Sequence, residues 1–270
     1  MRVAKLKGRW VVVTGAGAGI GRAIALEAAR RGGNVAICDI DAARLKETRA
    51  QLGDYAVDVT KSTQVKKFAA LVHKKADAVD ILVNNAGVVI AADILDTTAK
   101  DWEFILGVNL MGVVHFCDAF CPAMIKRNSG GHVVNIASME GFAAMEGFGA
   151  YSTTKFAVVG YSDALRQELS HHKIGVSVVC PGVVRTRLTA DMRSHGDYAA
   201  GISERIHQQH EKSSFGPEKV ADAVFSAVRF NTPLRPVAPE SWITYYSNRL
   251  SPRVTSFILQ QVAHRLLRNN

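Results

Sequence analysis

The sequence has little of several features that mark special classes of protein. Its 270 residues include only 4 cysteines and 7 prolines, and aromatic residues make up 7%. So few cysteines do not form a disulfide scaffold and suit a reducing compartment. A hydrophobic content of 48% with 21% charged residues excludes a disordered or collagen-like chain. We therefore expect one domain with a sizeable core, because α/β domains often reach this length.

Long apolar runs and leader-like segments are also missing. No uninterrupted apolar stretch approaches the roughly 18–20 residues of a membrane-spanning helix. Residues 1–10 are rich in lysine and arginine and lead straight into Val11-Val12-Val13, without the apolar region and cleavage site of a signal peptide. We predict a cytoplasmic protein with no transmembrane segment.

Acidic residues are the minority, with 24 against 33 lysines and arginines and a net charge of +9. Such a balance can attract nucleic acid, anionic lipid or a phosphate-bearing cofactor. The basic residues are dispersed, however, and no signature of the common nucleic-acid-binding motifs occurs. We therefore predict no nucleic-acid partner.

Clusters of cysteine and histidine with metal-ligand spacing do not occur. The nearest approach is His207 with His210, followed by Glu211, in a stretch typical of a solvated helix face. A zinc site needs further ligands at defined spacings, so we predict no metal. The cysteines form no C-x-x-C motif and are expected to be buried free thiols.

Short apolar runs alternate with helix-length amphipathic segments. We expect strands at Trp10–Val13, Asn34–Cys38, Ala56–Val57, Ile81–Val83, His132–Ala137 and Val176–Cys180. Helices are expected at Ile20–Arg31, Asp41–Leu52, Thr63–Lys75, Lys100–Lys126 and Tyr151–Leu169. Strands such as Val11-Val12-Val13 do not alternate with polar residues, as in a sheet covered on both faces. The pattern predicts an α/β fold with a doubly wound parallel sheet flanked by helices on both faces.

The pattern loosens after Pro181. Residues 187–215 form a polar stretch that is longer than ordinary connections and is expected to be a substrate-binding loop or lid; a helix follows at Pro217–Phe230. We place one domain at 1–232 and a basic C-terminal extension at 233–270, with a helix at Val254–Leu267. The extension has five arginines against one acid, Glu240. It can cover the substrate pocket or make a peripheral membrane contact, but packing on its own domain or a partner subunit is favoured.

A glycine-rich turn from Gly15 to Gly21 follows the first strand and opens a helix. Glycines let the backbone approach a pyrophosphate, whose charge the N–H groups at the helix N-terminus meet. Asp39 ends the second strand, where an acid that binds the ribose 2′-hydroxyl belongs. An acid there repels the 2′-phosphate of NADP, and neither Cys38 nor Ile40 is basic. We predict a single-domain Rossmann fold that prefers NAD to NADP.

Further motifs occur in a fixed order, and together they resemble the short-chain dehydrogenase/reductase family over roughly Gly8 to Thr189. Thr14–Gly21 matches its TGxxxGxG turn, residues 84–87 its NNAG motif, and residues 181–186 resemble its PGxxxT segment. The resemblance implies a catalytic tetrad of Asn109, Ser138, Tyr151 and Lys155, the last two in a YxxxK spacing. It implies cofactor contacts by Gly15, Gly17, Gly19, Ile20, Gly21, Asp39, Asp58, Val59, Asn85, Ala86, Gly87, Tyr151, Lys155, Pro181, Gly182, Val184 and Thr186.

The residue types of the tetrad suit acid–base chemistry. Tyr151 and Lys155 are four apart on a helix and share a face. A free tyrosine has a pKa of about 10, and we expect the lysine ammonium and the positive ring of oxidised nicotinamide to lower it. The resemblance implies that Tyr151 exchanges the proton of a substrate hydroxyl and that Lys155 also binds the cofactor ribose. Ser138 would donate to the substrate oxygen, and Asn109 would hold a water that links Lys155 to solvent.

The segment after Ser138 departs from the family, because larger residues stand where small ones are common. We expect Glu140 to point to solvent rather than to contact a polar substrate. Phe142, Met145 and Phe148 line an apolar pocket or pack in the core, with neither favoured.

The predicted function is NAD(H)-dependent interconversion of a secondary alcohol and a ketone, with a moderately large, apolar substrate such as a steroid, a retinoid or a hydroxyacyl compound. Two alternatives stay open, an NADPH-dependent carbonyl or 3-oxoacyl reductase and a non-catalytic dinucleotide-binding protein. The resemblance also implies a homotetramer or homodimer.

Overall fold

The centre of the molecule is a sheet of seven parallel strands, in the order β3-β2-β1-β4-β6-β7-β9. The computed structural model describes residues 6–48, 54–196, 202–211 and 213–268. The strands are β1 (Trp10–Thr14), β2 (Asn34–Asp39), β3 (Asp54–Ala56), β4 (Ile81–Asn84), β6 (Gly131–Ile136), β7 (Ile174–Pro181) and β9 (Leu234–Val237). The chain winds outward from β1 in both directions, which confirms the doubly wound prediction.

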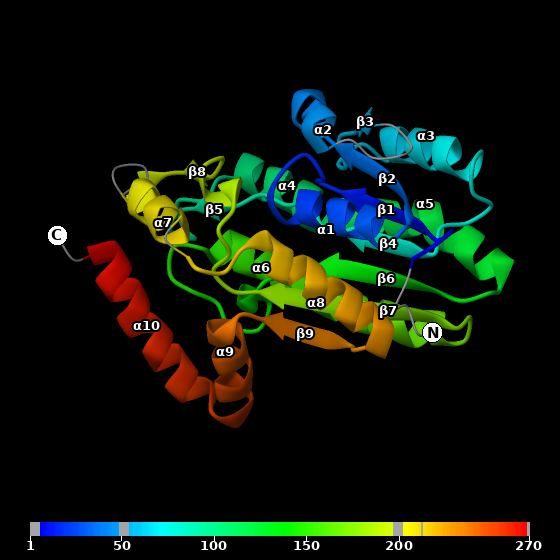
Figure 1. Cartoon of the computed structure of the whole chain (residues 1–270). Coiled ribbons are helices and arrows are strands. Elements are labelled where there is room, and N and C mark those ends of the chain that lie inside the picture. The colour runs from blue at the N-terminus through cyan, green and yellow to red at the C-terminus, as the bar shows by residue number, and fades with distance from the viewer. Residues whose placement is uncertain (1–5, 49–53, 197–201, 212, 269–270) are drawn as a thin grey trace.

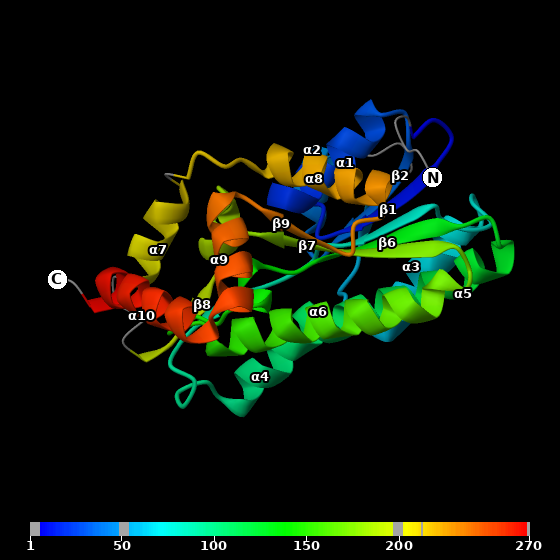
Figure 2. The same ribbon diagram turned by 90° about the horizontal axis from the view of Figure 1, so that it is seen from below.

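Helices cover both faces of this sheet (Figure 2). One face carries α1 (Gly19–Arg30), α2 (Ala42–Thr48) and α8 (Pro217–Phe230); the other carries α3 (Ser62–His73), the long helix described below and α6 (Gly149–Ser170). Val12 packs into the cluster on one face, whereas Val11 and Val13 pack into the cluster on the other. Burial on both faces explains why these strands do not alternate with polar residues.

The predicted helix at Lys100–Lys126 is present as one continuous helix with a wide turn inside it. It consists of α4 (Ala99–Leu106), the π-helical segment η1 (Gly107–Met111) and α5 (Gly112–Arg127). By length and composition alone this helix is apolar enough to span a membrane. Its Phe116 and Phe120 are fully buried, however, and both contact Phe68 of α3. Packing in the core of a folded domain therefore accounts for its apolar composition.

Smaller elements gather beyond the carboxyl ends of the strands, on the left in Figure 1. They are β5 (Ile90–Ala91), η2 (Met139–Gly141), η3 (Arg187–Thr189), β8 (Arg193–Ser194), α7 (Ile202–Glu211), α9 (Pro239–Leu250) and α10 (Pro252–Arg268). The polar stretch 187–215 thus contains three short elements, and its residues 197–201 and 212 lie outside the described part. The C-terminal extension begins inside the sheet, because β9 pairs with β7 as an edge strand. Residues 49–52 of the predicted helix Asp41–Leu52 also lie outside the described part.

All four cysteines are buried free thiols, as predicted. His207 lies on α7 and its Nδ1 is 3.2 Å from the hydroxyl of Thr189. Within the described residues, no three histidine, cysteine or acidic side chains gather closely enough to hold a metal ion.

A buried chain of polar side chains joins two strands to α6. Asn84 Nδ2 donates to Asn135 Oδ1 at 2.8 Å, and Asn135 Nδ2 donates to the hydroxyl of Ser162 at 2.8 Å. Asn135 is fully buried. Buried polar groups without partners destabilise a fold. The hydrogen bonds from Asn84 to Asn135 and from Asn135 to Ser162 therefore fix the position of α6 against β4 and β6.

Asn135→Ala is expected to lower the free energy of unfolding by about 2–6 kcal/mol, because two buried groups lose a partner at about 1–3 kcal/mol each. Urea unfolding followed by circular dichroism measures this change. Ser170→Ala is the control, because Ser170 is exposed at the end of α6 and its loss should change stability by less than about 0.5 kcal/mol. Equal stability of the two variants would contradict this role of Asn135.

Candidate active site

The glycine-rich turn between β1 and α1 leaves backbone N–H groups free to bind an anion. Gly15 and Gly19 have positive φ angles of 62° and 52°, which favour glycine. Ala18 begins α1 without a side-chain cap, and the first turn of the helix has no acidic residue. A Cβ on Gly21 would stand 2.1 Å from the carbonyl oxygen of Gly15. The turn therefore combines close backbone packing with an uncapped helix N-terminus, the arrangement that binds phosphate groups. Ile20 packs on the core beneath it.

Asp39 ends β2 and holds the turn from the other side. Its carboxylate accepts from the N–H groups of Gly17 at 2.8 Å and Asp41 at 3.0 Å. Arg44 is close in space although not in sequence, since a Cβ on Gly17 would stand 3.0 Å from its Cβ. The Arg44 guanidinium, however, pairs with Asp41 at 3.0 Å and with Asp191 at 2.8 Å. Two carboxylates other than Asp39 therefore balance this charge.

Asn85, Ala86 and Gly87 follow β4 and lie against the same turn. Asn85 Nδ2 donates to the carbonyls of Thr14 and Gly15 at 3.0 and 3.1 Å. The Thr14 hydroxyl oxygen accepts from the N–H groups of Asn85 and Ala86. A Cβ on Gly15 would stand 2.8 Å from the Cα of Ala86. The residues after β1 and after β4 that are predicted to contact the cofactor thus lie on one surface.

Asp58 and Val59 follow β3, next to β2, at the same edge of the sheet. The Asp58 carboxylate accepts from the N–H and the hydroxyl of Thr60 at 2.9 and 2.8 Å. Val59 is buried, and a Cβ on Gly112 would stand 2.9 Å from it. Both residues are therefore held in place by local contacts at this edge.

Residues 181–186 leave β7 and pass beside the phosphate-binding turn. The N–H of Gly182, which follows Pro181, donates to a carbonyl at the end of β9 at 2.9 Å. Val184 is buried in the core on the α1 and α8 face. A Cβ on Gly19 would stand 3.4 Å from the side chain of Thr186. The segment therefore borders the turn, and the cofactor-binding residues predicted around it come together in space.

Three members of the predicted tetrad meet where β6 ends and α6 begins. Lys155 Nζ donates to the carbonyl of Ile136 at 3.1 Å and lies 5.5 Å from the ring centre of Tyr151. The Ser138 hydroxyl interacts with the phenol of Tyr151. Tyr151, Lys155 and Ser138 are 8%, 4% and 9% exposed. A phenol, an ammonium group and a hydroxyl group thus lie close together in one buried site.

Asn109 lies in the π-helical segment η1, and such segments often mark functional sites. Its Oδ1 accepts from the N–H of Val88 at 2.8 Å, and its Nδ2 donates to the carbonyl of Val88 and to the hydroxyl of Thr154, both at 3.0 Å. The Thr154 hydroxyl in turn donates to the carbonyl of Tyr151 at 2.7 Å. Both amide hydrogens of Asn109 have protein acceptors, so the side chain fixes the backbone at Tyr151.

Burial is the main cause of the pKa shifts among the side chains around Tyr151. It raises the pKa of Tyr151 well above the usual value; a negative charge on Glu140 adds to this, and the Ser138 hydroxyl opposes it. Burial also lowers the pKa of Lys155 to about 8 and raises the pKa of Cys180 to about 12. In the chain by itself the pKa of Tyr151 is therefore raised and not lowered as predicted, because burial desolvates the phenolate; the effect of a bound oxidised nicotinamide stays a prediction.

The prediction of a solvent-exposed Glu140 is also wrong. Its N–H donates to the Ser138 hydroxyl at 3.2 Å as η2 begins, and its side chain turns inward and is 7% exposed. The hydroxyl of Ser152 donates to the carboxyl group. Burial raises the pKa of Glu140 to about 8, although the bond from Ser152 opposes the shift. Because Ser152 follows Tyr151 on α6, Glu140 lies beside the predicted tetrad.

The raised pKa predicts that Glu140 makes the fold less stable as pH rises. The folded chain binds this proton up to a pKa of about 8 and the unfolded chain only up to 4.5. Between these values stability falls with pH, by at most about 1.4 kcal/mol per pH unit. Glu140→Gln is expected to remove this slope while keeping an acceptor for Ser152. Urea unfolding at pH 5 and pH 8 measures it, with Glu103→Gln on the exposed part of α4 as the control. An unchanged slope in Glu140→Gln would contradict the assignment.

Apolar side chains border the other side of Tyr151. Phe148 and Tyr151 belong to one buried cluster, against which Met145 packs. The rest of the cluster comes from β5, α4, α7 and α10. Phe142 packs differently, with its ring 5.3 Å from that of Tyr245 on α9. Two of the three predicted pocket residues therefore lie on the tyrosine's apolar side, and the third supports α9.

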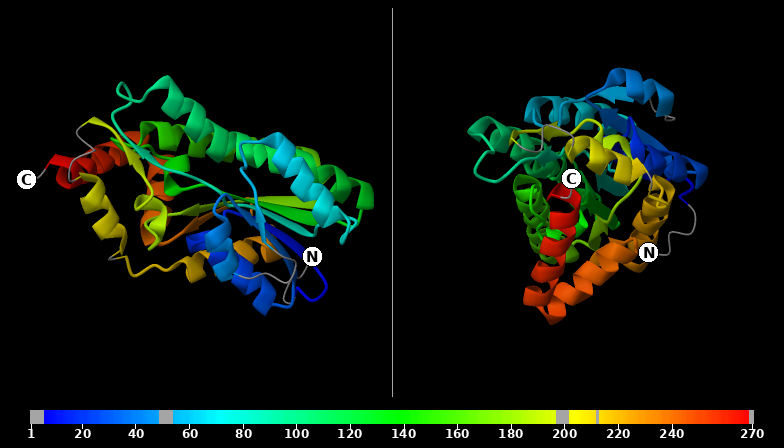
Figure 3. Two further views of the ribbon diagram at one scale, coloured as in Figure 1. Left: turned by 90° about the horizontal axis from the view of Figure 1, so that it is seen from above. Right: turned by 90° about the vertical axis from the view of Figure 1, so that its left-hand side faces the viewer.

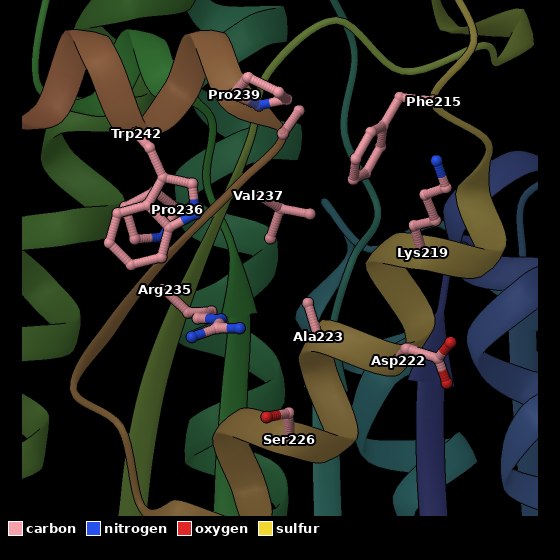
Figure 4. A pocket seen from close by; sticks show the side chains of 11 residues that line it. Phe215, Lys219, Asp222, Ala223, Ser226, Arg235, Pro236, Val237, Pro239 and Trp242 are labelled. Atoms are coloured by element: carbon pink, nitrogen blue, oxygen red, sulfur yellow. The ribbon is translucent and has the colours of Figure 1, made fainter.

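A separate pocket of about 430 Å³ lies between α8, β9 and α9 (Figure 4). Lys219, Asp222 and Ser226 on α8 face Arg235 and Trp242 across it. The Arg235 guanidinium carbon is 5.5 Å from the ring centre of Trp242. No member of the predicted tetrad lines this pocket, so it is distinct from the candidate active site.

Comparisons with known proteins agree with this geometry. The family profile described as short chain dehydrogenase matches residues 9–197. The chain is 41% identical over 258 residues to "Probable oxidoreductase EphD" of Mycobacterium tuberculosis, covering 90% of this chain and 43% of that protein. It is 34% identical over 191 residues to "CLA biosynthesis dehydrogenase/reductase" of Lactiplantibacillus plantarum, covering 67% of each. The chain thus spans less than half the length of its mycobacterial relatives.

Solved structures show the same fold. A short chain dehydrogenase/reductase from Burkholderia phymatum in complex with NAD superposes with a TM-score of 0.86 at 27% identity, over 93% of this chain and 96% of that one. A short chain dehydrogenase from Mycobacterium paratuberculosis bound to NAD gives 0.76 at 25% identity, over 87% and 97%. The chain therefore belongs to the short-chain dehydrogenase family of oxidoreductases.

Proposed function

We propose that the chain catalyses NAD(H)-dependent interconversion of a secondary alcohol and a ketone. The observation that carries the proposal is the meeting of Tyr151, Lys155 and Ser138 at the carboxyl ends of β6 and β7, the edge of an open α/β sheet that binds ligands. A phenol beside an ammonium is suited to exchange a proton.

The glycine turn fits a dinucleotide. Its N–H groups at the start of α1 would hold the pyrophosphate, since no side chain caps them. Asp39 would accept from the ribose hydroxyls, and Lys155 has two ammonium hydrogens left for the other ribose beyond its bond to Ile136. When bound, the nicotinamide supplies hydride transfer at C4 and a positive charge that favours a phenolate.

The chain's own residues would handle the proton and the substrate oxygen. Tyr151 would take the proton of the alcohol or return it to the ketone oxygen. Ser138 would donate a hydrogen bond to that oxygen as negative charge develops on it. Lys155 would stabilise the phenolate, and Asn109 would hold α6 so that the phenol stays in place.

A moderately large, apolar substrate is supported by the side chains on the apolar side of Tyr151. Met145, Leu188 and Met192 pack on the cluster that contains Tyr151 and Phe148. Apolar walls with a few polar groups are typical of small-molecule sites. The described part of 187–215 supplies two of these side chains, in keeping with a role in closing the site.

The preference for NAD is tested at Asp39. Asp39→Asn keeps the size of the side chain and removes the negative charge, so we expect NADPH to bind about 10–100 times more tightly while NADH loses about tenfold, in the range of one charged hydrogen bond. Fluorescence titration of both reduced cofactors measures the ratio. Asp118→Asn, at an exposed position of α5, is the control. A wild-type chain that already prefers NADPH would favour the alternative, an NADPH-dependent reductase.

Assembly as a homodimer or homotetramer is part of the proposal. Met111 in η1 and Phe156 on α6 are 41% and 44% exposed, and apolar side chains of this size on neighbouring helices suit a subunit contact. Light scattering after size-exclusion chromatography gives the number of subunits, and a monomer at micromolar concentration would exclude both assemblies.

A further inference from the structure

The C-terminal helix α10 has a buried inner face and an exposed outer face that is apolar. Its inner face packs on the body of the protein through Thr255 and Ala263, which are 3% and 1% exposed. Its outer face, defined here as Val254, Phe257, Ile258 and Val262, is 41–61% exposed. Residues three and four apart share a helix face, so these four side chains form a continuous strip.

The outer face has nothing over it in the described part of the molecule. The right-hand view of Figure 3 shows α10 in front of the other elements, and Figure 1 shows α9 and α10 as a V at the edge of the molecule. Leu250, at the turn between the two helices, is 86% exposed. Exposed apolar strips of this kind mark interaction surfaces.

Charge indicates the kind of partner. Arg249 and Arg253 are exposed on either side of Leu250, and no acidic residue follows Glu240 in the sequence. An apolar helix face bordered by arginines fits an anionic bilayer, where the apolar side chains enter the acyl boundary and the arginines meet the headgroups. A second copy is a poorer fit, because a twofold contact through this face would bring the arginines of both copies together.

We propose that the outer face of α10 binds peripherally to an anionic membrane surface. Through its inner face the same helix belongs to the cluster that contains Tyr151. A hollow of about 430 Å³ lies between Leu259 and Gln260 of α10 and the segment 144–149 that leads to Tyr151. A docked bilayer would therefore lie next to the apolar side of the reacting centre.

Co-sedimentation of the full chain with vesicles tests the proposal. We expect binding to vesicles of phosphatidylglycerol and phosphatidylcholine, and at least about tenfold weaker binding to phosphatidylcholine alone. Phe257→Ser with Ile258→Ser should lower binding to the anionic vesicles at least about tenfold. Arg249→Gln with Arg253→Gln should lower it about twenty-fivefold, at about fivefold for each arginine.

The matched control is Leu26→Ser with Phe230→Ser, which removes two exposed apolar side chains from α1 and α8 and should leave vesicle binding unchanged. Circular dichroism of every variant checks that the fold is kept, as exposed positions predict. Failure of the wild-type chain to bind anionic vesicles, or equal binding by the α10 variants, would overturn the proposal. So would light scattering in which the α10 variants lose subunits while vesicle binding persists, because a second copy would then cover this face.

Discussion

Tyr151→Phe is expected to lower kcat by about 10²–10⁴-fold, the contribution of a positioned acid–base group. Tyr151 is 8% exposed; its phenol interacts with the Ser138 hydroxyl, and its backbone carbonyl accepts from the Thr154 hydroxyl. Phenylalanine fills the same space, so cofactor affinity and stability should change little. Stopped-flow or steady-state measurement of reduced nicotinamide gives kcat, and fluorescence titration gives the dissociation constant of NADH.

Tyr161→Phe is the control for this prediction, because Tyr161 lies on the same helix and interacts with Cys117 away from the centre. Its kcat should stay within about twofold of the wild type, which corresponds to less than about 0.5 kcal/mol. Retention of full activity by Tyr151→Phe would show that the phenol is not the acid–base group of the reaction. A loss in which NADH binding also disappears would instead indicate a structural role.

Gly21→Ala is expected to abolish most cofactor binding and to destabilise the fold. A Cβ at this position would stand 2.1 Å from the carbonyl oxygen of Gly15 and 2.5 Å from Asn85 Nδ2. Since the first of these atoms belongs to the backbone of the turn, the turn itself must move. We expect the dissociation constant of NADH to rise at least about a hundredfold and the free energy of unfolding to fall by about 1–3 kcal/mol.

Gly160→Ala is the matched control, because, apart from its chain neighbours and the adjacent helix backbone, no described heavy atom lies within 4 Å of a Cβ at that position of α6. Alanine favours a helix over glycine by up to about 1 kcal/mol, so this variant should be as stable as the wild type or more so, with NADH binding unchanged. If Gly21→Ala bound NADH as tightly as Gly160→Ala, the turn would not be the cofactor site.

The central sheet could be predicted because burial leaves a strong pattern in the sequence. Strands buried on both faces show as apolar runs, and helix-length amphipathic segments alternate with most of them. The edge strand β9 could not be predicted in the same way. It is a short strand that contains Pro236, and proline within an apolar run argues against a strand unless it lies at a sheet edge. Because β9 pairs with β7 on one side only, it is an edge strand and tolerates the proline.

The residues that come together at the candidate site could be predicted from motifs, but their electrostatics could not. Glu140 is buried because the Ser138 cap directs η2 inward and Ser152 of α6 meets its carboxyl group. That contact depends on tertiary packing, and a glutamate in a sequence favours solvent. The pKa of Tyr151 is likewise set by burial, which spacing along a helix does not reveal. Arg44 near Gly17 is a third case, because it approaches through space from α2.

The most direct test of the proposed reaction is turnover of NAD⁺ with a panel of apolar secondary alcohols, followed by the absorbance of the reduced nicotinamide, with NADP⁺ in parallel. The account predicts reduction of NAD⁺ by at least one alcohol, a slower reaction with NADP⁺, and loss of both in Tyr151→Phe. Undiminished turnover in Tyr151→Phe, or turnover with NADP⁺ that exceeds turnover with NAD⁺, would contradict it.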